Sequence, residues 1–173
     1  MNQRHTIAEL NTLSRDEFVR LIGPVFEHSP WIAEGSWAKR PFSGLDELHL
    51  RLCETVSTAG PDKQLALIRA HPDLVGRAAL AGALTAASNS EQASAGLNQL
   101  TPDEIAAFQK FNQAYREKFG FPFVICARLN KKAAILNGFH IRLSNSREQE
   151  IQTALEEIFK IARLRLEDIV KSA

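Results

Sequence analysis

Helix-start signals recur along this chain, and they limit its fold more than any other feature of the sequence. A Ser or Thr followed three residues later by Glu or Gln, the pattern called a capping box, precedes helical patterns at Ser14, Thr101 and Ser146. The segment opened by Thr101 has Pro102 at its first helical position and is expected to end at Gly120. We therefore expect a protein built mainly of α-helices.

Only one run of residues is typical of a β-strand. Residues 121–127, FPFVICA, are apolar, aromatic and β-branched, but no second run of similar quality could pair with them. We expect an extended segment followed by a buried helix. Two prolines and two glycines predict an irregular stretch over residues 30–44, before a helix that resumes near Leu45. The predicted fold is all-α, a single-domain helical bundle of about eight helices over residues 1–173.

Composition excludes several classes of partner. The 173 residues carry a formal net charge of +1 with scattered basic residues, so we expect no nucleic-acid partner. The longest run of mostly small apolar residues has about half the length of about 20 that a membrane span needs, so we expect no membrane partner.

Cysteine content and the chain ends predict a cytoplasmic protein. The two cysteines, Cys53 and Cys126, are too few for a secreted disulfide scaffold. The N-terminal segment MNQRHTIAEL does not have the pattern of a signal peptide, and the final Lys-Ser-Ala is not a peroxisomal Ser-Lys-Leu tail.

The common metal and nucleotide motifs are absent from the sequence. It contains no His-Glu-x-x-His, no Cys-x-x-Cys, no phosphate-binding Gly-rich loop and no Gly-x-Ser-x-Gly. None of the five histidines lies four residues from another. We expect no metal site.

His71 is the histidine whose position is most suggestive of a functional site. Pro72 disfavours helical geometry at His71, so the preceding helix is expected to stop there, and Pro72-Asp73 suits the first turn of a new helix. That helix N-terminus would disfavour an imidazolium, whereas a nearby carboxylate would favour it. The alternative is a plain helix-breaking His-Pro turn.

Glu91 could be the carboxylate that acts with His71. A His–carboxylate pair is a common general acid–base unit. However, Ser88 and Glu91 together form a capping box, so Glu91 could equally serve only to bind a backbone N–H. Cys126 could be a nucleophile or an inert buried thiol. Its apolar neighbours Ile125 and Ala127 favour the inert thiol.

The last helical pattern places an arginine on its apolar face. The apolar stripe consists of Ile151, Leu155, Ile158, Ala162 and Ile169. At about 100° per residue, Arg165 falls inside this stripe and Arg163 points away from it. Because an unpaired buried charge is costly, we expect Arg165 to extend to solvent, to pair with a structural carboxylate or to bind an anionic ligand.

Four segments, taken together, resemble the OHCU decarboxylase family, where OHCU is 2-oxo-4-hydroxy-4-carboxy-5-ureidoimidazoline. The similarity runs from about Ile7 to about Val170. The matching segments are His71-Pro72-Asp73-Leu74-x-Gly76, Ser88-x-x-Glu91-Gln92-x-x-Ala95-Gly96-Leu97, Phe119-Gly120-Phe121-Pro122-Phe123-Val124 and Arg142-Leu143-x-Asn145-Ser146.

The resemblance implies a set of site residues. His71 would be the catalytic acid–base, assisted by Glu91, and Pro72 would contact the substrate. Arg165 would bind the substrate carboxylate, with Arg163 as the less favoured alternative. The remaining pocket residues implied are Ser88, Asn89, Ser90, Gln92, Phe123, Val124, Ile125, Cys126 and Ala127, the last five supplying a wall and backbone groups.

The resemblance also implies the reaction and its setting. The reaction is decarboxylation of the anionic OHCU to S-allantoin in urate degradation, without a metal or organic cofactor. A homodimer in the bacterial cytoplasm is expected, with possible functional coupling to hydroxyisourate hydrolase. Two other readings stay open: a non-catalytic helical binding module and a hydrolase of a related ureido compound.

Overall fold

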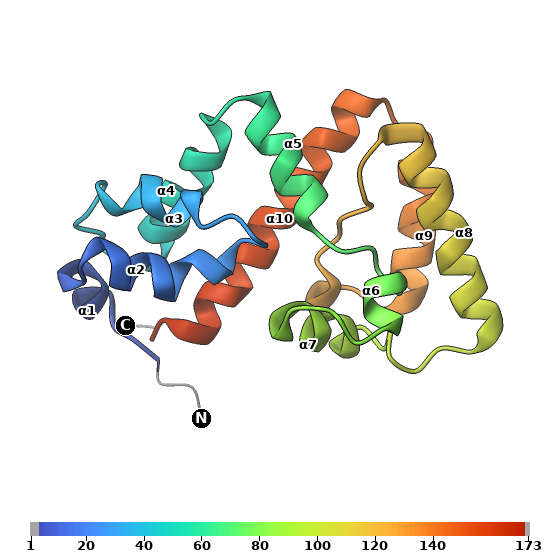
Figure 1. Cartoon of the computed structure of the whole chain (residues 1–173), viewed down its shortest axis with the longest axis horizontal. Coiled ribbons are helices and arrows are strands. Elements are labelled where there is room, and N and C mark those ends of the chain that lie inside the picture. The colour runs from blue at the N-terminus through green and yellow to red at the C-terminus, as the bar shows by residue number, and fades with distance from the viewer. Residues whose placement is uncertain (1–3, 172–173) are drawn as a thin grey trace. The chain divides into compact units, whose positions relative to one another are not determined.

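The computed structural model describes residues 4–171, apart from the side chain of Ala78. Met1 to Gln3 of the N-terminal segment and Ser172-Ala173 of the C-terminal tail lie outside the described residues. The helices are α1 (Ile7–Thr12), α2 (Arg15–Ile22), α3 (Trp31–Trp37), α4 (Leu45–Ser57), α5 (Pro61–Ala70), α6 (Arg77–Leu80), α7 (Ala86–Ser94), α8 (Pro102–Phe119), α9 (Lys132–Arg142) and α10 (Arg147–Ile169), with short 3-10 helices η1 (Gly23–Val25) and η2 (Ala127–Leu129) (Figure 1).

The all-α fold is confirmed. Between residues 4 and 171 there is no β-strand, and the one isolated bridge joins His5 to Val170. The strand-like residues 121–126 form no strand and lead into η2 and then α9, as expected. The expectation of a buried helix was wrong, because α9 buries only Ile135, Phe139 and Arg142. The expectation of about eight helices did not include short helices such as α1 and α3. No helix in the described part of the chain is both long enough and apolar enough to span a bilayer.

The predicted caps are present in the structure. Ser14 and Thr101 each form a full capping box with the glutamate three residues later. At the start of α10, Ser146 Oγ accepts from the N–H of Gln149, and Gln149 Oε1 accepts from the N–H of Ser146. Gly120 ends α8 with a left-handed φ of 80°, a conformation that favours glycine.

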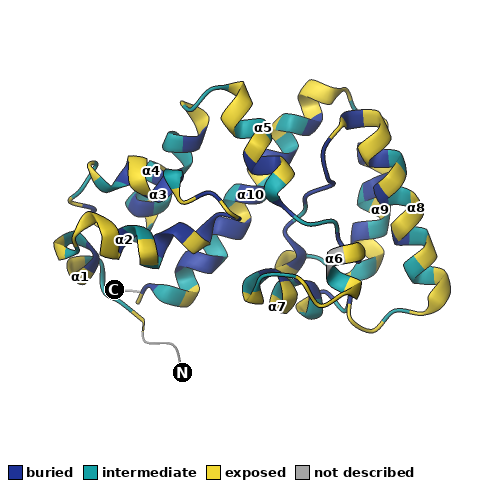
Figure 2. Ribbon diagram, in the orientation of Figure 1, coloured by how far each residue is buried: buried dark blue, intermediate teal, exposed yellow. Residues whose placement is uncertain are grey.

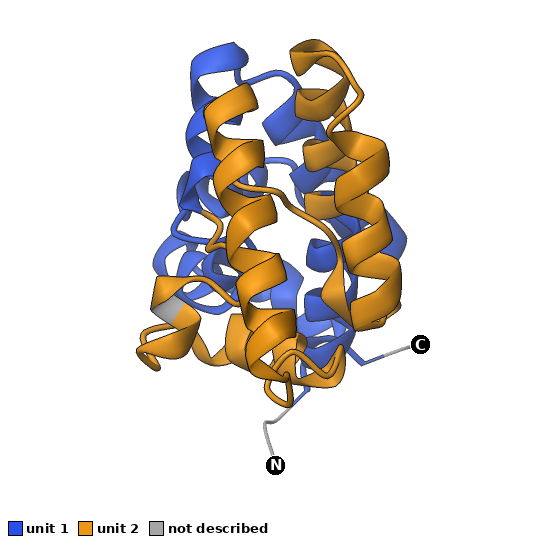
Figure 3. Cartoon of the chain, turned by 90° about the vertical axis from the view of Figure 1, so that its right-hand side faces the viewer, with its two compact units in different colours: residues 1–70, 159–173 blue, residues 71–158 orange. Residues whose placement is uncertain are grey.

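The chain forms two compact units. The first unit comprises residues 1–70 and 159–173, and the second comprises residues 71–158 (Figure 3). Helix α10 contributes residues to both, because the division falls between Ile158 and Phe159. The boundaries of a single domain over residues 1–173 stay a prediction.

In the first unit, α2, α3 and α4 pack around buried apolar side chains, among them Phe18, Ile32 and Leu52. The expectation of an irregular stretch over residues 30–44 was wrong in its first half, where α3 forms. Gly35 acts there as a point of close helix contact, since a Cβ on it would lie 2.9 Å from Cγ2 of Thr55. Glycine at this position therefore serves packing rather than chain reversal.

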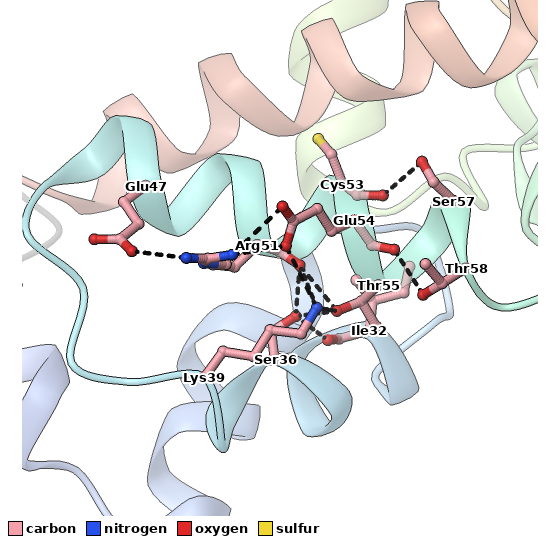
Figure 4. A network of polar contacts seen from close by, with 10 residues as sticks. All are labelled: Ile32, Ser36, Lys39, Glu47, Arg51, Cys53, Glu54, Thr55, Ser57 and Thr58. Carbon is pink, nitrogen blue, oxygen red and sulfur yellow. Dashed lines mark hydrogen bonds and ion pairs between the residues drawn. The ribbon is translucent and has the colours of Figure 1, made fainter.

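Polar contacts also join α3 to α4 (Figure 4). The hydroxyls of Ser36 and Thr55 lie 2.7 Å apart, and Lys39 Nζ donates to Thr55 Oγ1 at 3.0 Å. Along α4, Arg51 forms ion pairs with Glu47 at 3.2 Å and Glu54 at 3.1 Å. The contacts of Ser36 and Lys39 with Thr55 thus join α3 and the residue that follows it to α4, whereas the Arg51 ion pairs lie within α4.

The second unit has an aromatic core. Tyr115 of α8 lies edge-on to Phe123 and Phe139, and the rings of Phe123 and Phe139 stack with centroids 3.8 Å apart. All three side chains are essentially fully buried. Figure 2 shows the buried residues of α8 and α9 on one side of each helix, with exposed residues on the other. This core anchors the extended segment that precedes η2.

Candidate functional site

His71 lies directly after the last residue of α5, as the His-Pro pair predicted, and only 6% of it is exposed. The expectation of a new helix beginning at Pro72 was wrong. Residues 72–76 form a turn in which Gly76 N–H donates to Asp73 O, and α6 begins only at Arg77. Val75 has a left-handed φ of 52°, which a continuing helix does not permit. The expected effect of a helix N-terminus on His71 therefore loses its basis.

Side chains from α8 bind the turn that follows His71. Arg116 Nε donates to both carboxylate oxygens of Asp73 at 2.9 Å. Asn112 Nδ2 donates to the carbonyl of Leu74 at 2.7 Å. Sequence reasoning did not single out Asn112 or Arg116, because their position on α8 carries no local signal of a distant turn.

The structure excludes the capping interpretation of Glu91. Helix α7 begins one turn earlier than expected, at Ala86, and its N-cap is Thr85, whose side chain accepts from the N–H of Ser88. Ser88 is thus the third residue of the helix, and the predicted Ser88–Glu91 capping box was wrong. Glu91 lies in the middle of α7, where a capping role is not available to it.

Helix α7 divides its predicted pocket residues between two faces. Ser88 and Gln92 are buried and Glu91 is half-buried, and the spacing of three and four residues places them on one face. Asn89 and Ser90 are exposed. Gln92 Oε1 accepts from the N–H of Val75 at 3.1 Å, so α7 is bound to the turn after His71.

The predicted wall, residues 123–127, is anchored from three sides within the second unit. Arg142 Nη1 donates to the carbonyl of Val124 at 2.6 Å, and Glu157 Oε2 accepts from the N–H of Cys126 at 2.8 Å. Gly138 of α9 lies against Phe123, since a Cβ on it would be 3.4 Å from the ring, within van der Waals contact. Protein groups bind at least four backbone groups of the wall, since the carbonyls of Cys126 and Ala127 also accept hydrogen bonds from residues 129–130. Ile125 is its one half-exposed member.

Cys126 has the character of an inert thiol. It is 1% exposed, and burial, with the Glu157 and Glu91 carboxylates nearby, raises the pKa of its thiol. A raised thiol pKa disfavours the thiolate that a nucleophile requires. Helix α7, which carries Glu91, packs directly on η2, which follows Cys126. In the second unit, α7 thus contacts both the turn after His71 and the predicted wall.

Arg142 and Glu150 form a buried network that sequence reasoning did not assign a role. Arg142 Nε donates to Glu150 Oε2 at 2.8 Å, and Asn145 Nδ2 donates to Glu150 Oε1 at 2.7 Å. The hydroxyl of Tyr115 donates to the same carboxylate. The guanidinium also lies 4.3 Å from the ring centroid of Phe123. This network holds the carbonyl and ring that begin the wall.

The two candidate arginines of α10 differ as the stripe argument predicted. In the first unit, Arg165 is 7% exposed and its Nη1 lies 2.9 Å from Glu27 Oε2. Arg163 is 33% exposed and pairs with Glu167 and Asp46. Arg165 therefore has the structural carboxylate that one interpretation required.

No group of three or more His, Cys, Asp or Glu side chains in residues 4–171 is arranged to hold a metal ion.

Comparison with known proteins identifies the family. The sequence profile described as OHCU decarboxylase matches residues 11–167. The chain belongs to the OHCU decarboxylase family. The 2-oxo-4-hydroxy-4-carboxy-5-ureidoimidazoline decarboxylase of Halalkalicoccus jeotgali is 43% identical over 96% of this chain and 92% of the relative. Membership in the OHCU decarboxylase family confirms the resemblance drawn from the four sequence segments.

The crystal structure of an (S)-allantoin synthase has a similar fold, with a TM-score of 0.77 and 28% identity. The match covers 97% of this chain and 54% of that one. A uric acid degradation bifunctional protein from Bacillus sp. is 42% identical over 95% of this chain, which spans 32% of its length. OHCU decarboxylase domains thus also occur as part of longer proteins of urate degradation.

Proposed function

We propose that this protein catalyses the decarboxylation of OHCU to S-allantoin, with neither a metal nor an organic cofactor. Membership in the OHCU decarboxylase family supports the reaction. The structural observation that carries the residue assignment is the position of α7. That helix contacts the turn after His71 and packs on η2, whose first residue, Ala127, is the last residue of the wall. It also carries Glu91 at a position where helix capping does not account for a carboxylate.

The substrate supplies its own electron sink. OHCU has a carboxylate and a hydroxyl on one ring carbon, next to a C=N bond. When CO2 leaves, the electrons of the broken C–C bond form a ring C=C bond, and the C=N nitrogen takes up a proton. The hydroxyl of this enol then loses a proton while the neighbouring carbon gains one, so the overall reaction consumes one proton. A bound cofactor is not needed to accept the electrons.

We assign the proton transfers to His71, assisted by Glu91. An imidazole can both donate and accept a proton near neutral pH, and a carboxylate can orient it and favour its charged form. A positioned acid–base group of this kind typically contributes about 10²–10⁴-fold to a rate. Protonation on one face of the ring would give S-allantoin rather than the racemate.

Arg165 is the proposed ligand of the substrate carboxylate. Guanidinium binds carboxylates in a bidentate manner, and Glu27 orients this one. Arg163 is less suited because it is more exposed and is engaged by two carboxylates on the surface of its own unit.

Further pocket contacts are proposed from Pro72, Ser88, Glu91, Gln92 and the wall residues 123–127. Asn89 and Ser90 are weaker members of this set, because α7 directs them to solvent.

The biological setting is also a proposal. A related bifunctional protein of uric acid degradation supports coupling to another step of urate degradation, and we propose the hydroxyisourate hydrolase step. Both cysteines are unpaired, which supports a reducing cytoplasm, and we propose a bacterial one. A homodimer is expected for the enzyme.

A coupled assay tests the reaction. OHCU is generated in place from urate with urate oxidase and hydroxyisourate hydrolase, and circular dichroism follows the formation of chiral allantoin with and without this protein. We expect a fast S-allantoin signal that falls about 10²–10⁴-fold in His71→Asn, which keeps the size of the side chain but does not transfer protons near neutral pH.

Two outcomes would contradict the proposal. A wild-type trace no faster than spontaneous, racemic decay would remove the enzyme assignment and favour the binding-module reading. Wild-type turnover in His71→Asn would retain the reaction but exclude His71 as its acid–base.

A further inference from the structure

The turn after His71 is strained. Val75 adopts φ = 52°, and for a β-branched residue a positive φ is a rare and costly conformation. Gly76 next to it is also constrained, since a Cβ there would lie 2.6 Å from Cβ of Asp73. Such a turn persists only where its surroundings hold it in place.

Two hollows border this turn. A hollow of about 780 Å³ lies on one side, lined in part by Asp73, Gly76 and Asn112. A second hollow of about 310 Å³ is lined in part by Val75 and Gln92. The side chains of Leu74 and Val75 are buried and pack within the second unit, and directional hydrogen bonds hold the main chain of the turn beside the two hollows.

Two buried amide side chains bind the main chain of the turn, in addition to the ion pair that Arg116 forms with the side chain of Asp73. Asn112 Nδ2 donates to Leu74 O at 2.7 Å, and Gln92 Oε1 accepts from Val75 N–H at 3.1 Å. Asn112 of α8 thus binds the main chain at Leu74, and Gln92 of α7 binds it at the next residue, Val75. Both amides are 6% exposed.

One atom of the Asn112 side chain is unfavourable for the stability of the second unit. Its Oδ1 is buried and has no hydrogen-bond partner among the described residues. A buried acceptor without a partner is unfavourable, so an apolar residue would be the cheaper choice here if packing were the only requirement. The benefit that remains is the single bond to Leu74 O.

Resting on the function proposed above, we propose that Asn112 is a positioning residue for catalysis. Together with Gln92 it holds the left-handed turn at Val75 and, through the rigid Pro72, fixes where the imidazole of His71 lies. Asn112 acts through the main chain and does not contact the substrate.

The test compares Asn112→Leu, which removes the donor at similar volume, with Gln113→Leu, a control at the next, exposed position of α8. In the coupled assay, Asn112→Leu is expected to lower kcat about tenfold with KM changed far less. The solvent deuterium isotope effect on kcat is expected to rise, because a misplaced His71 slows proton transfer relative to other steps. Gln113→Leu is expected to leave all three quantities unchanged.

A rescue experiment separates positioning from general support of the fold. Val75→Gly removes the strain, because glycine adopts positive φ freely. In the Val75→Gly background, the loss of kcat caused by Asn112→Leu is expected to be several-fold smaller. If Asn112→Leu does not fold, Asn112→Ser, whose short side chain does not reach Leu74 O, replaces it in both backgrounds.

The results distinguish the two proposals. A wild-type protein without S-allantoin formation would refute the proposed function. An active wild type whose kcat is unaffected by the Asn112 variants, or whose loss is equal in both backgrounds with an unchanged isotope effect, would refute the positioning role alone.

Discussion

The side chains of Arg142 and Glu150 form an ion pair at 2.8 Å, with only 9% and 0% of them exposed. Burial and the neighbouring Glu150 carboxylate raise the pKa of Tyr115, so its phenol stays protonated and donates to Glu150. Asn145 and the Val124 carbonyl take the remaining positions around the pair. A buried ion pair is tolerated when each charge is satisfied in this way.

Removal of one member of this pair is expected to be strongly destabilising. Arg142→Met leaves the Glu150 charge buried without its cation, which typically costs about 3–5 kcal/mol of the free energy of unfolding. Urea denaturation measures this loss. Arg15→Met, which breaks an exposed ion pair with Glu34, is the control and is expected to cost a small fraction of that. Equal losses in the two variants would show that burial does not set the energy of the Arg142 pair.

Substitutions of Thr85 and Glu91 are expected to have different effects, one on the stability of the protein and the other on its rate of catalysis, although both residues belong to α7 or its cap. Thr85 caps α7, so Thr85→Ala should lower the free energy of unfolding by about 1 kcal/mol and affect turnover little. Glu91→Gln should leave stability nearly unchanged and reduce kcat at least about tenfold, as part of the acid–base contribution. Thermal unfolding and the coupled assay measure the two effects. A Glu91→Gln variant that lost stability but kept its rate would restore a structural role for Glu91.

The structural and substrate roles proposed for Arg165 can also be separated. Arg165→Met leaves Glu27 buried without its cation and should destabilise the protein by about 3–5 kcal/mol. In the double variant Arg165→Met/Glu27→Gln, much of this stability is expected to return, because the unpaired charge is gone. Activity should not return, because no guanidinium is left to bind the substrate carboxylate. Recovery of turnover together with stability would limit Arg165 to a structural role.

Acid sensitivity of the second unit is expected to involve Glu104. A side-chain bond from Lys132, followed by the backbone N–H of Thr101, holds the pKa of Glu104 below its ordinary value of 4.5. A carboxyl group whose pKa is lower in the folded state stabilises that state above its unfolded pKa. This contribution is lost as pH falls from about 4.5 through the lowered folded pKa.

The comparison of wild type with Glu104→Gln checks this prediction. Above pH 5 the wild type should be the more stable in urea denaturation, and the difference should shrink as pH falls below about 4.5. A difference that stayed constant between pH 6 and pH 3 would show that ionisation of Glu104 does not contribute.

Local sequence predicted where α2, α8 and α10 begin and where α5 and α8 end. The capping boxes at Ser14, Thr101 and Ser146 lie where predicted, because such caps involve residues only three positions apart. The stop at Ala70 before His71 and the stop at Gly120 follow in the same way from backbone restrictions on single residues. The inward position of Arg165 followed from helical periodicity alone.

Tertiary structure decided the points at which local rules conflict. Ser88 satisfies the pattern of a cap, yet Thr85 caps α7 instead. In the folded unit this helix packs on η2, and Gln92 Oε1 accepts a bond from the N–H of Val75. Gly35 was read as a helix breaker, yet it lies inside α3, where the absence of a side chain allows close contact with Thr55.

The sequence by itself thus determined the helical class, the family and the identity of the candidate residues, since these depend on short-range patterns and their order. Only the tertiary structure showed that Asn112 and Gln92 grip the turn after His71, and that Arg142 and Glu157 anchor the wall. These bonds join residues separated by 17 to 38 positions in the chain. No local propensity encodes such a pairing, because it forms only when packing of the whole unit brings the two segments together.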